Sequence, residues 1–237
     1  MGLLGVKAIA FDVFGTVVDW RSSLIREGEA MGRAKGISAD WAAFAGAWQA
    51  GKDPAIERIR LGAAPWSTLD AIHRARLDLL LGQFGISGLE EEEKDQFNRA
   101  WHRLAPWPDS VPGLQRLKRH YAVTTLSNGN FSALVNMARH AGLPWDCVIA
   151  VDLFGCYKPA PEVYLGAADL LGLAPGEVML AAAHNYDLRA AHANGLRTGY
   201  IRRPLEFGPG QKTDLEPDQT WDVMAESIEE LAEKMGA

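Results

Sequence analysis

The sequence contains four polar clusters whose side chains could carry out one reaction together. They are Asp12 with Thr16, the segment Ser127-Asn128-Gly129-Asn130, the segment Tyr157-Lys158-Pro159, and the segment His184-Asn185-Tyr186-Asp187. A carboxylate can act as a nucleophile, a lysine can neutralise the charge beside it, and hydroxyl and amide groups can bind an anion. A lone Asp or Lys after a strand is more often a solvated loop residue. The clusters therefore indicate chemistry only if the fold brings them together.

The apolar runs around these clusters predict such a fold. Short buried strands are expected near 6–13, 122–126, 148–151, 178–182 and 198–201, with helices at 131–141, 161–171 and 188–194 between the later ones. This alternation predicts an α/β protein with a doubly wound, mostly parallel, Rossmann-like sheet. Ligands of such sheets bind outside the carboxyl ends of the strands. All four clusters fall at those ends, so we expect them to meet at one edge of the sheet.

The segment between the first and second strands is too long for a loop and has no strand signal. Helices are expected near 22–35, 39–61, 67–84 and 89–104. The sequence therefore predicts an α/β core domain (residues 1–17 and 108–237) into which a helical cap domain (18–107) is inserted. Residues 205–217 are rich in turn formers and are expected to form a surface loop. A final helix, or a strand and a helix, is expected over 221–234.

Composition and charge disfavour several classes of protein. The 237 residues carry a net charge of −6, whereas a nucleic-acid surface would need a basic patch. No apolar run approaches the ~20 residues that span a bilayer, and the first residues lack a signal-peptide pattern. The two cysteines suggest neither a disulfide framework nor a zinc site. We expect a cytoplasmic protein that binds neither nucleic acid nor a membrane.

The motifs FDVFGT, TLSNGN, YKPAPEVY and AAAHNYD occur in this order along the chain. They resemble the four ordered motifs of the haloacid dehalogenase superfamily, and the likeness covers almost the entire chain. The inserted helices resemble the helical cap of that superfamily. The resemblance implies that Asp12 is the nucleophile, that Thr16 and Ser127 bind and orient, and that Lys158 neutralises the surroundings of the nucleophile.

Most members of that superfamily are magnesium phosphatases, and this sequence departs from their pattern at two positions. They carry a carboxylate two residues after the nucleophile, where this chain has Phe14, and usually a second acid in the last motif, where it has Ala183. Magnesium prefers oxygen ligands in octahedral geometry, which Asp12 and Asp187 alone supply poorly. The chain instead resembles the (S)-2-haloacid dehalogenase (type II) branch, which works without a metal or other cofactor. In that branch Phe14 would wall an apolar pocket.

The resemblance implies hydrolysis of short 2-haloalkanoic acids, such as haloacetates and (S)-2-halopropionate, to 2-hydroxy acids in two steps. Asp12, ionised with an ordinary pKa near ~3.9 and favoured further by Lys158, attacks the halogen-bearing carbon and forms an ester. Water then attacks the ester carbonyl, and Asp187 is the candidate for activating it. Ser127 and Asn128 are expected to hold the substrate carboxylate. Tyr164, where the dehalogenases carry a tyrosine, is expected to bond near the lysine.

Two further departures concern the halide and the last motif. An arginine on a cap helix helps to draw off the halide in the dehalogenases, and this chain has Gln49 after Trp48 there, with Arg58 or Arg60 as possible substitutes. His184, where many of them have asparagine, could donate to substrate, water or halide, and Trp66 could form a pocket wall. The other five histidines and four further tryptophans are interpreted as packing or surface residues. They are His73, His102, His120, His140, His192, Trp41, Trp48, Trp101 and Trp107.

Two alternative functions stay open. One is a phosphatase of the same superfamily with atypical metal ligands, and the other is a non-catalytic ligand-binding relative. The expected partner of the leading hypothesis is a small anionic haloacid. Because related enzymes often dimerise, a homodimer is possible.

Overall fold

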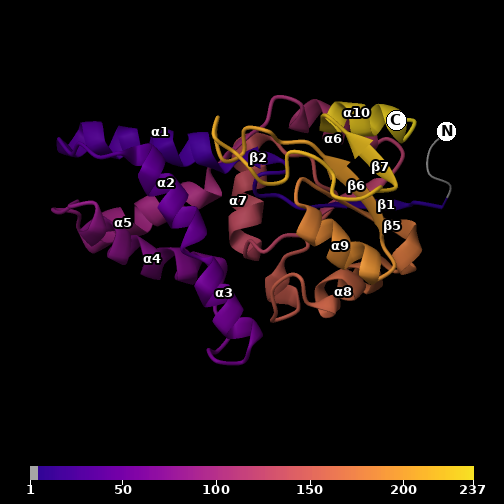
Figure 1. The fold of residues 1–237 in the computed structure, drawn as a ribbon, viewed down its shortest axis with the longest axis horizontal. Coiled ribbons are helices and arrows are strands. Elements are labelled where there is room, and N and C mark those ends of the chain that lie inside the picture. Colours follow the sequence, from indigo (N-terminus) through magenta and orange to yellow (C-terminus); the bar gives the residue numbers. More distant parts are fainter. Residues whose placement is uncertain (1–4) are drawn as a thin grey trace.

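A computed structural model describes residues 5–237, which form an α/β half and a helical half lying side by side (Figure 1). Both ends of the described segment, at residues 5 and 237, lie on the α/β half, away from the helical half (Figure 1). Among residues 5–237, no helix is both long enough and apolar enough to cross a membrane.

The α/β half is built on a five-stranded sheet in which every neighbouring pair is parallel. The strand order is β4 (Ala122–Thr125), β1 (Ala8–Phe11), β5 (Val178–Ala182), β6 (Arg197–Ile201) and β7 (Val223–Ala225). Ala10 in β1 is in register with Thr124 on one side and Leu180 on the other. Every residue of β1 and β5 is buried, as expected for a parallel sheet that is covered on both faces.

Helices cover both faces of the sheet, which confirms the predicted doubly wound α/β fold (Figure 1). Helices α6 (Ser110–Leu117), α7 (Phe131–Ala141) and α10 (Ile228–Lys234) contribute to one core cluster, and α8 (Pro161–Leu171) and α9 (Asn185–Ala193) to the other. Helix α6 was not predicted from the sequence.

The strand predicted at 148–151 is wrong. The chain makes only isolated bridges there, at Cys147 and Ala150, and then enters the short 3-10 helix η2 (Val151–Leu153). Side-chain hydroxyls replace part of the backbone ladder: Thr124 Oγ1 donates to the carbonyl oxygen of Cys147, and Thr125 Oγ1 bonds both to the carbonyl oxygen and to the N–H of Ile149. The fifth strand of the sheet is β7. It lies in segment 221–234, for which the sequence predicted either a final helix or a strand followed by a helix.

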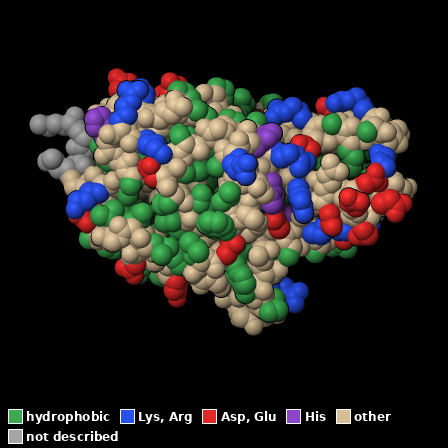
Figure 2. Space-filling view, turned by 180° about the vertical axis from the view of Figure 1, so that it is seen from behind, with side chains coloured by type: hydrophobic (Ala, Val, Ile, Leu, Met, Phe, Trp, Pro, Cys, Tyr) green, Lys and Arg blue, Asp and Glu red, His purple; other side chains and the backbone are tan. Residues whose placement is uncertain are grey.

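The helical half contains α1 (Trp20–Lys35), α2 (Trp41–Ala50), α3 (Asp53–Arg60), α4 (Leu69–Gln83), α5 (Glu91–Asn98) and the 3-10 helix η1 (Arg99–His102). The single helix predicted over 39–61 is two helices, and Pro54 lies in the first turn of the second, where its missing N–H is tolerated. Acidic and basic side chains are both frequent on the face of this half seen in Figure 2. Within this half, Arg74 pairs with Asp78, Glu91 and Asp95. The interior holds packed aromatic rings, including Phe44, Trp48, Phe97 and Trp101.

The two halves are joined by a short antiparallel ribbon. Strand β2 (Val18–Asp19) pairs with β3 (Ala105–Pro106), and between them the chain makes its excursion into the helices. Trp107 Nε1 donates to the carbonyl oxygen of Gly15 across the same junction. The ribbon supports the division into a core domain (1–17 and 108–237) and a cap domain (18–107), which stays a prediction.

The 3-10 helix η3 (Pro175–Glu177) lies between α8 and β5 and leads into the amino end of β5. At the opposite, carboxyl edge of the sheet, the loops that leave β1, β4 and β5 carry three of the four polar clusters. The fourth precedes α8, so the fold places all four beside the helical half.

Candidate active site

Asp12, directly after β1, lies at the centre of the polar clusters and is only 7% exposed. Its Oδ2 accepts a hydrogen bond from Thr16 Oγ1 at 2.8 Å and lies 3.1 Å from His184 Nδ1, while its Oδ1 lies 3.3 Å from Lys158 Nζ. Burial alone would raise the pKa of this carboxyl, but the Lys158 cation and the His184 contact outweigh it and hold the pKa well below its ordinary value. Asp12 is therefore ionised over the whole physiological range.

Lys158 joins two carboxylates and is itself buried. Its Nζ lies 2.6 Å from Asp187 Oδ2 in addition to the Asp12 contact, and its backbone N–H donates to Asn128 Oδ1 at 3.0 Å. Burial would lower the pKa of the ammonium, but the two aspartates raise it above the ordinary value. Lys158 therefore remains a cation beside the nucleophile.

Asp187 has no solvent exposure, and both of its oxygens are occupied. Oδ2 accepts from Lys158, and Oδ1 accepts from Tyr164 Oη at 2.6 Å. Burial raises the pKa of Asp187 despite the lysine. These contacts fix the position of the ammonium. Tyr164, which the sequence predicted to bond near the lysine, donates to Asp187.

His184 bridges two carboxylates, and the second of them was missed by sequence analysis. Its Nε2 lies 3.0 Å from Oε2 of Glu206, whose Oε1 also accepts from Trp20 Nε1 at 3.1 Å. Although burial opposes charge on the imidazole, Glu206 and Asp12 raise the pKa of His184 well above its ordinary value. A protonated His184 donates from both ring nitrogens, one toward Asp12 and one toward Glu206.

Glu206 lies in the segment 205–217 that was predicted to be a surface loop, yet it is 1% exposed. A Cβ on Gly15 would lie 2.1 Å from Glu206 Oε1, so only glycine allows this approach, and the φ of +86° at Gly15 favours glycine as well. The position of Glu206 in the sequence could have indicated that it belongs to the site, because it follows the end of β6 at the same carboxyl edge as the other clusters.

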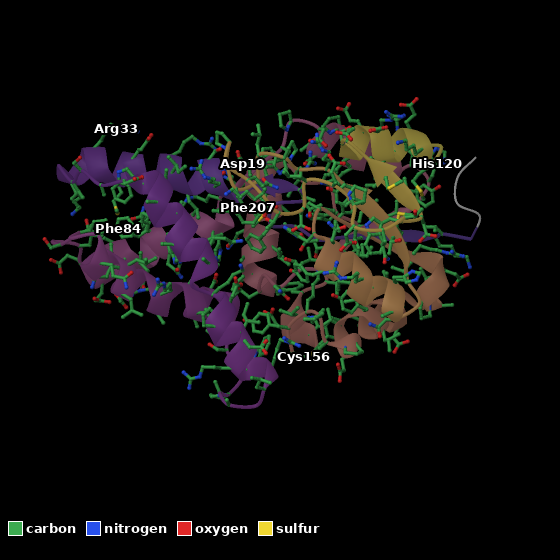
Figure 3. All side chains as sticks on the ribbon, viewed as in Figure 1. Asp19, Arg33, Phe84, His120, Cys156 and Phe207 are labelled. Carbon is green, nitrogen blue, oxygen red and sulfur yellow. The ribbon has the colours of Figure 1, made fainter. Side chains whose placement is uncertain are left out.

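A cavity of about 510 Å³ separates the Asp12 network from the helical half. The core contributes charged and polar walls, and the helical half contributes α2, α3 and α4. Its lining includes Asp12, Phe14, Trp20, Arg21, Gln49, Lys52, Ile56, Arg60, Leu69, His73, Asn128, Lys158, His184, Glu206 and Phe207. Figure 3 shows Phe207 at the junction of the two halves, near Asp19.

The predicted substrate-binding residues separate into two groups. Phe14, Gln49, Asn128 and His184 line the cavity. Ser127 and Tyr164 are fully buried and do not line it; Ser127 Oγ accepts from the N–H of Gly129 and so shapes the loop. Thr16 is connected to the site through Asp12, because its Oγ1 donates a hydrogen bond to Asp12 Oδ2.

The prediction that Trp66 forms a cavity wall is wrong. Its ring packs on Tyr157 with centroids 4.8 Å apart, and it is absent from the cavity lining. The physical reason lies at the start of α4, where Tyr157 Oη donates to the carbonyl oxygen of Ser67 and holds this turn over the core. Of the two arginines considered for the halide, Arg60 lines this cavity, whereas Arg58 lines a separate groove.

The donor set does not resemble a metal centre. Among residues 5–237, no group of three or more His, Cys, Asp and Glu side chains is arranged to hold a metal ion. The two carboxylates that magnesium would need, Asp12 and Asp187, both contact Lys158 Nζ. The side chain two residues after the nucleophile is Phe14, which packs edge-on against Trp101.

Comparison with known proteins agrees with this geometry. The family model for haloacid dehalogenase-like hydrolases matches residues 6–195. An (S)-2-haloacid dehalogenase from Pseudomonas sp. (strain CBS-3) is 30% identical over 210 residues, which cover 85% of this chain and 88% of the relative. The chain therefore belongs to the haloacid dehalogenase-like hydrolase family.

Two solved structures are more similar still. The crystal structure of an L-2-haloacid dehalogenase superposes with a TM-score of 0.96 at 50% identity and covers 98% of this chain and 99% of its own. That of a defluorinating L-2-haloacid dehalogenase has a TM-score of 0.96 at 48% identity, with coverage of 98% and 96%.

Proposed function

We propose that this chain is an (S)-2-haloacid dehalogenase that hydrolyses short 2-haloalkanoic acids to 2-hydroxy acids through an ester to Asp12, without a metal ion. The observation that carries the proposal is the buried, ionised Asp12 held by Lys158 beside a cavity that is walled by Phe14 instead of a second carboxylate. The similarity to the two L-2-haloacid dehalogenase structures supports it.

In the first step, an oxygen of Asp12 attacks the halogen-bearing carbon from behind. The carbon–halogen bond breaks, its electron pair leaves with the halide, and the configuration at carbon inverts. Lys158 and Thr16 hold the carboxylate in place for attack. Asn128, whose Oδ1 is occupied by the N–H of Lys158, presents its amide N–H groups to the substrate carboxylate.

In the second step, water attacks the carbonyl carbon of the Asp12 ester, and the bond from that carbon to the ester oxygen breaks. The 2-hydroxy acid leaves with an oxygen that belonged to Asp12, and the carboxylate is regenerated. Water must lose a proton and the product oxygen must gain one, so a group beside Asp12 has to handle a proton.

His184, backed by Glu206, fits that role better than Asp187, the candidate from sequence. Both oxygens of Asp187 are occupied by Lys158 and Tyr164, whereas His184 contacts Asp12 directly and lines the cavity. Esterification neutralises Asp12, which is one of the two carboxylates that raise the pKa of His184. The pKa of His184 then falls, which prepares it to exchange a proton. Asp187 remains essential as the group that positions Lys158.

The phosphatase alternative is not favoured. A phosphomonoester needs a general acid for its leaving oxygen, and Phe14 occupies the position at which the phosphatases carry it. The proposed partner is a small haloacid; a cytoplasmic location and a homodimer stay predictions.

A single-turnover experiment in water labelled with heavy oxygen tests the proposal. With enzyme in excess over bromoacetate, the glycolate formed should carry an unlabelled hydroxyl, and the peptide that contains Asp12 should gain the label. A labelled hydroxyl in the first turnover would mean that water attacks the substrate carbon, and the assignment of Asp12 as nucleophile would fall.

A further inference from the structure

His73, on the inner face of α4, is a buried histidine that the proposed mechanism does not use. Its side chain is 1% exposed, and its ring stacks on Trp101 with centroids 4.0 Å apart and planes 16° from parallel. Trp48 packs edge-on against the same ring and donates from Nε1 to the carbonyl oxygen of His73. The imidazole is therefore held in one orientation between two indoles.

Neither ring nitrogen of His73 has a hydrogen-bond partner among the residues that the structure describes. Buried polar side-chain atoms are almost always paired, and an unpaired one costs stability. His73 also lines the cavity that contains Asp12. Because neither nitrogen is occupied by a residue in the range 5–237, the buried imidazole keeps its full hydrogen-bonding capacity at the wall of the cavity.

The helix that carries His73 is fixed to the core beside the cavity. At the start of α4, the N–H of Asp70 donates to Asn130 Oδ1 and Asn130 Nδ2 donates to Asp70 Oδ2, so the helix is anchored on the core loop after β4. His73 follows one turn further along the same helix. Attack by Asp12 with inversion sends the halogen away from Asp12, toward the helical half.

The protonation state of His73 suits a hydrogen-bond donor. Burial, with a further contribution from the Lys52 cation, lowers its pKa to about 3. The ring is therefore neutral at working pH and carries one N–H and one acceptor nitrogen. Lys52 lines the same wall, where its Nζ bonds to the carbonyl oxygen of Gln49 and to Asp53, and it adds positive potential.

We propose that His73 is a specificity-determining residue that donates its ring N–H to the departing halide, in the part of the cavity where the expected arginine is replaced by Gln49. The proposal rests on the proposed dehalogenase function. The halide leaves with the electron pair of the carbon–halogen bond, and His73 keeps its proton throughout. A fixed N–H donor stabilises a small, concentrated anion more than a large one, so its effect is greatest for fluoride and decreases through chloride and bromide to iodide.

The test measures halide release in the first turnover from fluoro-, chloro-, bromo- and iodoacetate by the wild-type protein, His73→Phe and His73→Gln. All four substrates form the same ester on Asp12, so the rate of ester hydrolysis is identical for all of them and serves as an internal control. His73→Phe should slow chloride release at least tenfold more than iodide release, and fluoride release more still. His73→Gln, which keeps a neutral N–H donor, should restore much of this difference.

A matched control is His102→Phe, because His102 is also a buried cap histidine but has both nitrogens paired, with Asp70 and Asn136. It should lose thermal stability without changing the dependence on the halide. His73→Phe should keep or raise the Tm, because it removes an unpaired polar group. Equal slowing of all four halides by His73→Phe, or a rise in KM alone, as a carboxylate-binding residue would give, would overturn the proposal.

The same measurements distinguish a wrong dehalogenase assignment from a wrong role for His73. If the wild-type protein releases no halide from any haloacetate, the dehalogenase assignment itself is wrong. If it releases halide and His73→Phe leaves the ratios between the four rates unchanged, only the role of His73 is wrong.

Discussion

The cavity has one wall on the α/β half, with Asp12, Lys158 and His184 (the core wall), and one on the helical half, with His73 (the cap wall). The histidines of the two walls satisfy their ring nitrogens in opposite ways. On the core wall, Asp12, Lys158 and His184 each contact at least two partners within the protein. On the cap wall, the ring of His73 is packed against aromatic rings, and its two nitrogens have no hydrogen-bond partner among residues 5–237. The core wall is therefore preorganised for charge, whereas the cap wall holds a donor that no residue in this range occupies.

The largest effect is expected from removing the centre of the core wall. Asp12→Ala should lower steady-state bromide release at least ~10⁴-fold, about 5 kcal/mol, because no other group can form the ester. Asp12→Asn is a less clean variant, since slow deamidation would restore activity over time. Retention of more than a few per cent of turnover by Asp12→Ala would show that the core wall does not supply the nucleophile.

The next prediction concerns the cap wall and its stability in acid. The pKa of His73 is about 3 in the folded protein against an ordinary 6.5, so between these values the unfolded chain binds a proton that the folded chain does not. Stability that depends on a neutral His73 is therefore lost as the pH falls below 6.5. The unfolding free energy of His73→Phe minus that of the wild-type protein should therefore be roughly 2–3 kcal/mol higher at about pH 4.5 than near pH 8.

Urea unfolding of both proteins at the two pH values measures this gain. The same stability difference at both values would mean that His73 is protonated at about pH 4.5 in the folded protein as readily as in the unfolded chain. Its ring would then not be shielded from water, and the contrast between the two walls would disappear.

The two walls also differ in how far the sequence predicts them. The core residues Asp12, Lys158 and Asp187 could be placed together because each follows a strand or loop at one edge of a parallel sheet, and strand alternation predicts that edge. The side-chain ladder of Thr124 and Thr125 could not be foreseen, so a strand at 148–151 was predicted where only bridges form.

The cap wall depends on helix orientation and on contacts between distant segments. The helical spacing indicates a helix over α4, but which of its residues faces the cavity depends on how Trp48 and Trp101 pack, so His73 was interpreted as a packing or surface residue. Glu206 was missed because its burial results from contacts with Gly15, Trp20 and His184, far away in the chain. Local composition gives no information on such pairings.

A smaller effect is expected from Glu206→Gln, which weakens the core wall at its outer end. Loss of the carboxylate should lower the pKa of His184, and turnover should fall about ten- to a hundredfold, about 1.4–2.7 kcal/mol. Because the folded pKa of His184 is raised, its stabilising contribution is fully present below the ordinary value of 6.5 and is lost as the pH rises through the folded value.

The loss of unfolding free energy in Glu206→Gln should therefore be largest below pH 6.5 and should shrink in alkali. Glu177→Gln, which removes a surface glutamate paired with Lys7, is the matched control and should change neither turnover nor this pH dependence. A pH-independent loss in Glu206→Gln would show that the His184–Glu206 contact acts by packing and not by charge.

The smallest expected effect is from chelation, which should leave turnover unchanged. In the core wall, Lys158 Nζ contacts both Asp12 and Asp187 and already neutralises the charge that a divalent ion would balance. Phe14 and Ala183 occupy the positions at which the phosphatases of the superfamily carry further acids, so the oxygen ligands that magnesium requires are too few. Bromide release should therefore be the same in EDTA, in buffer and with added magnesium. If EDTA abolished turnover and magnesium restored it, the core wall would need an ion beside the lysine, and the metal-free mechanism would be wrong.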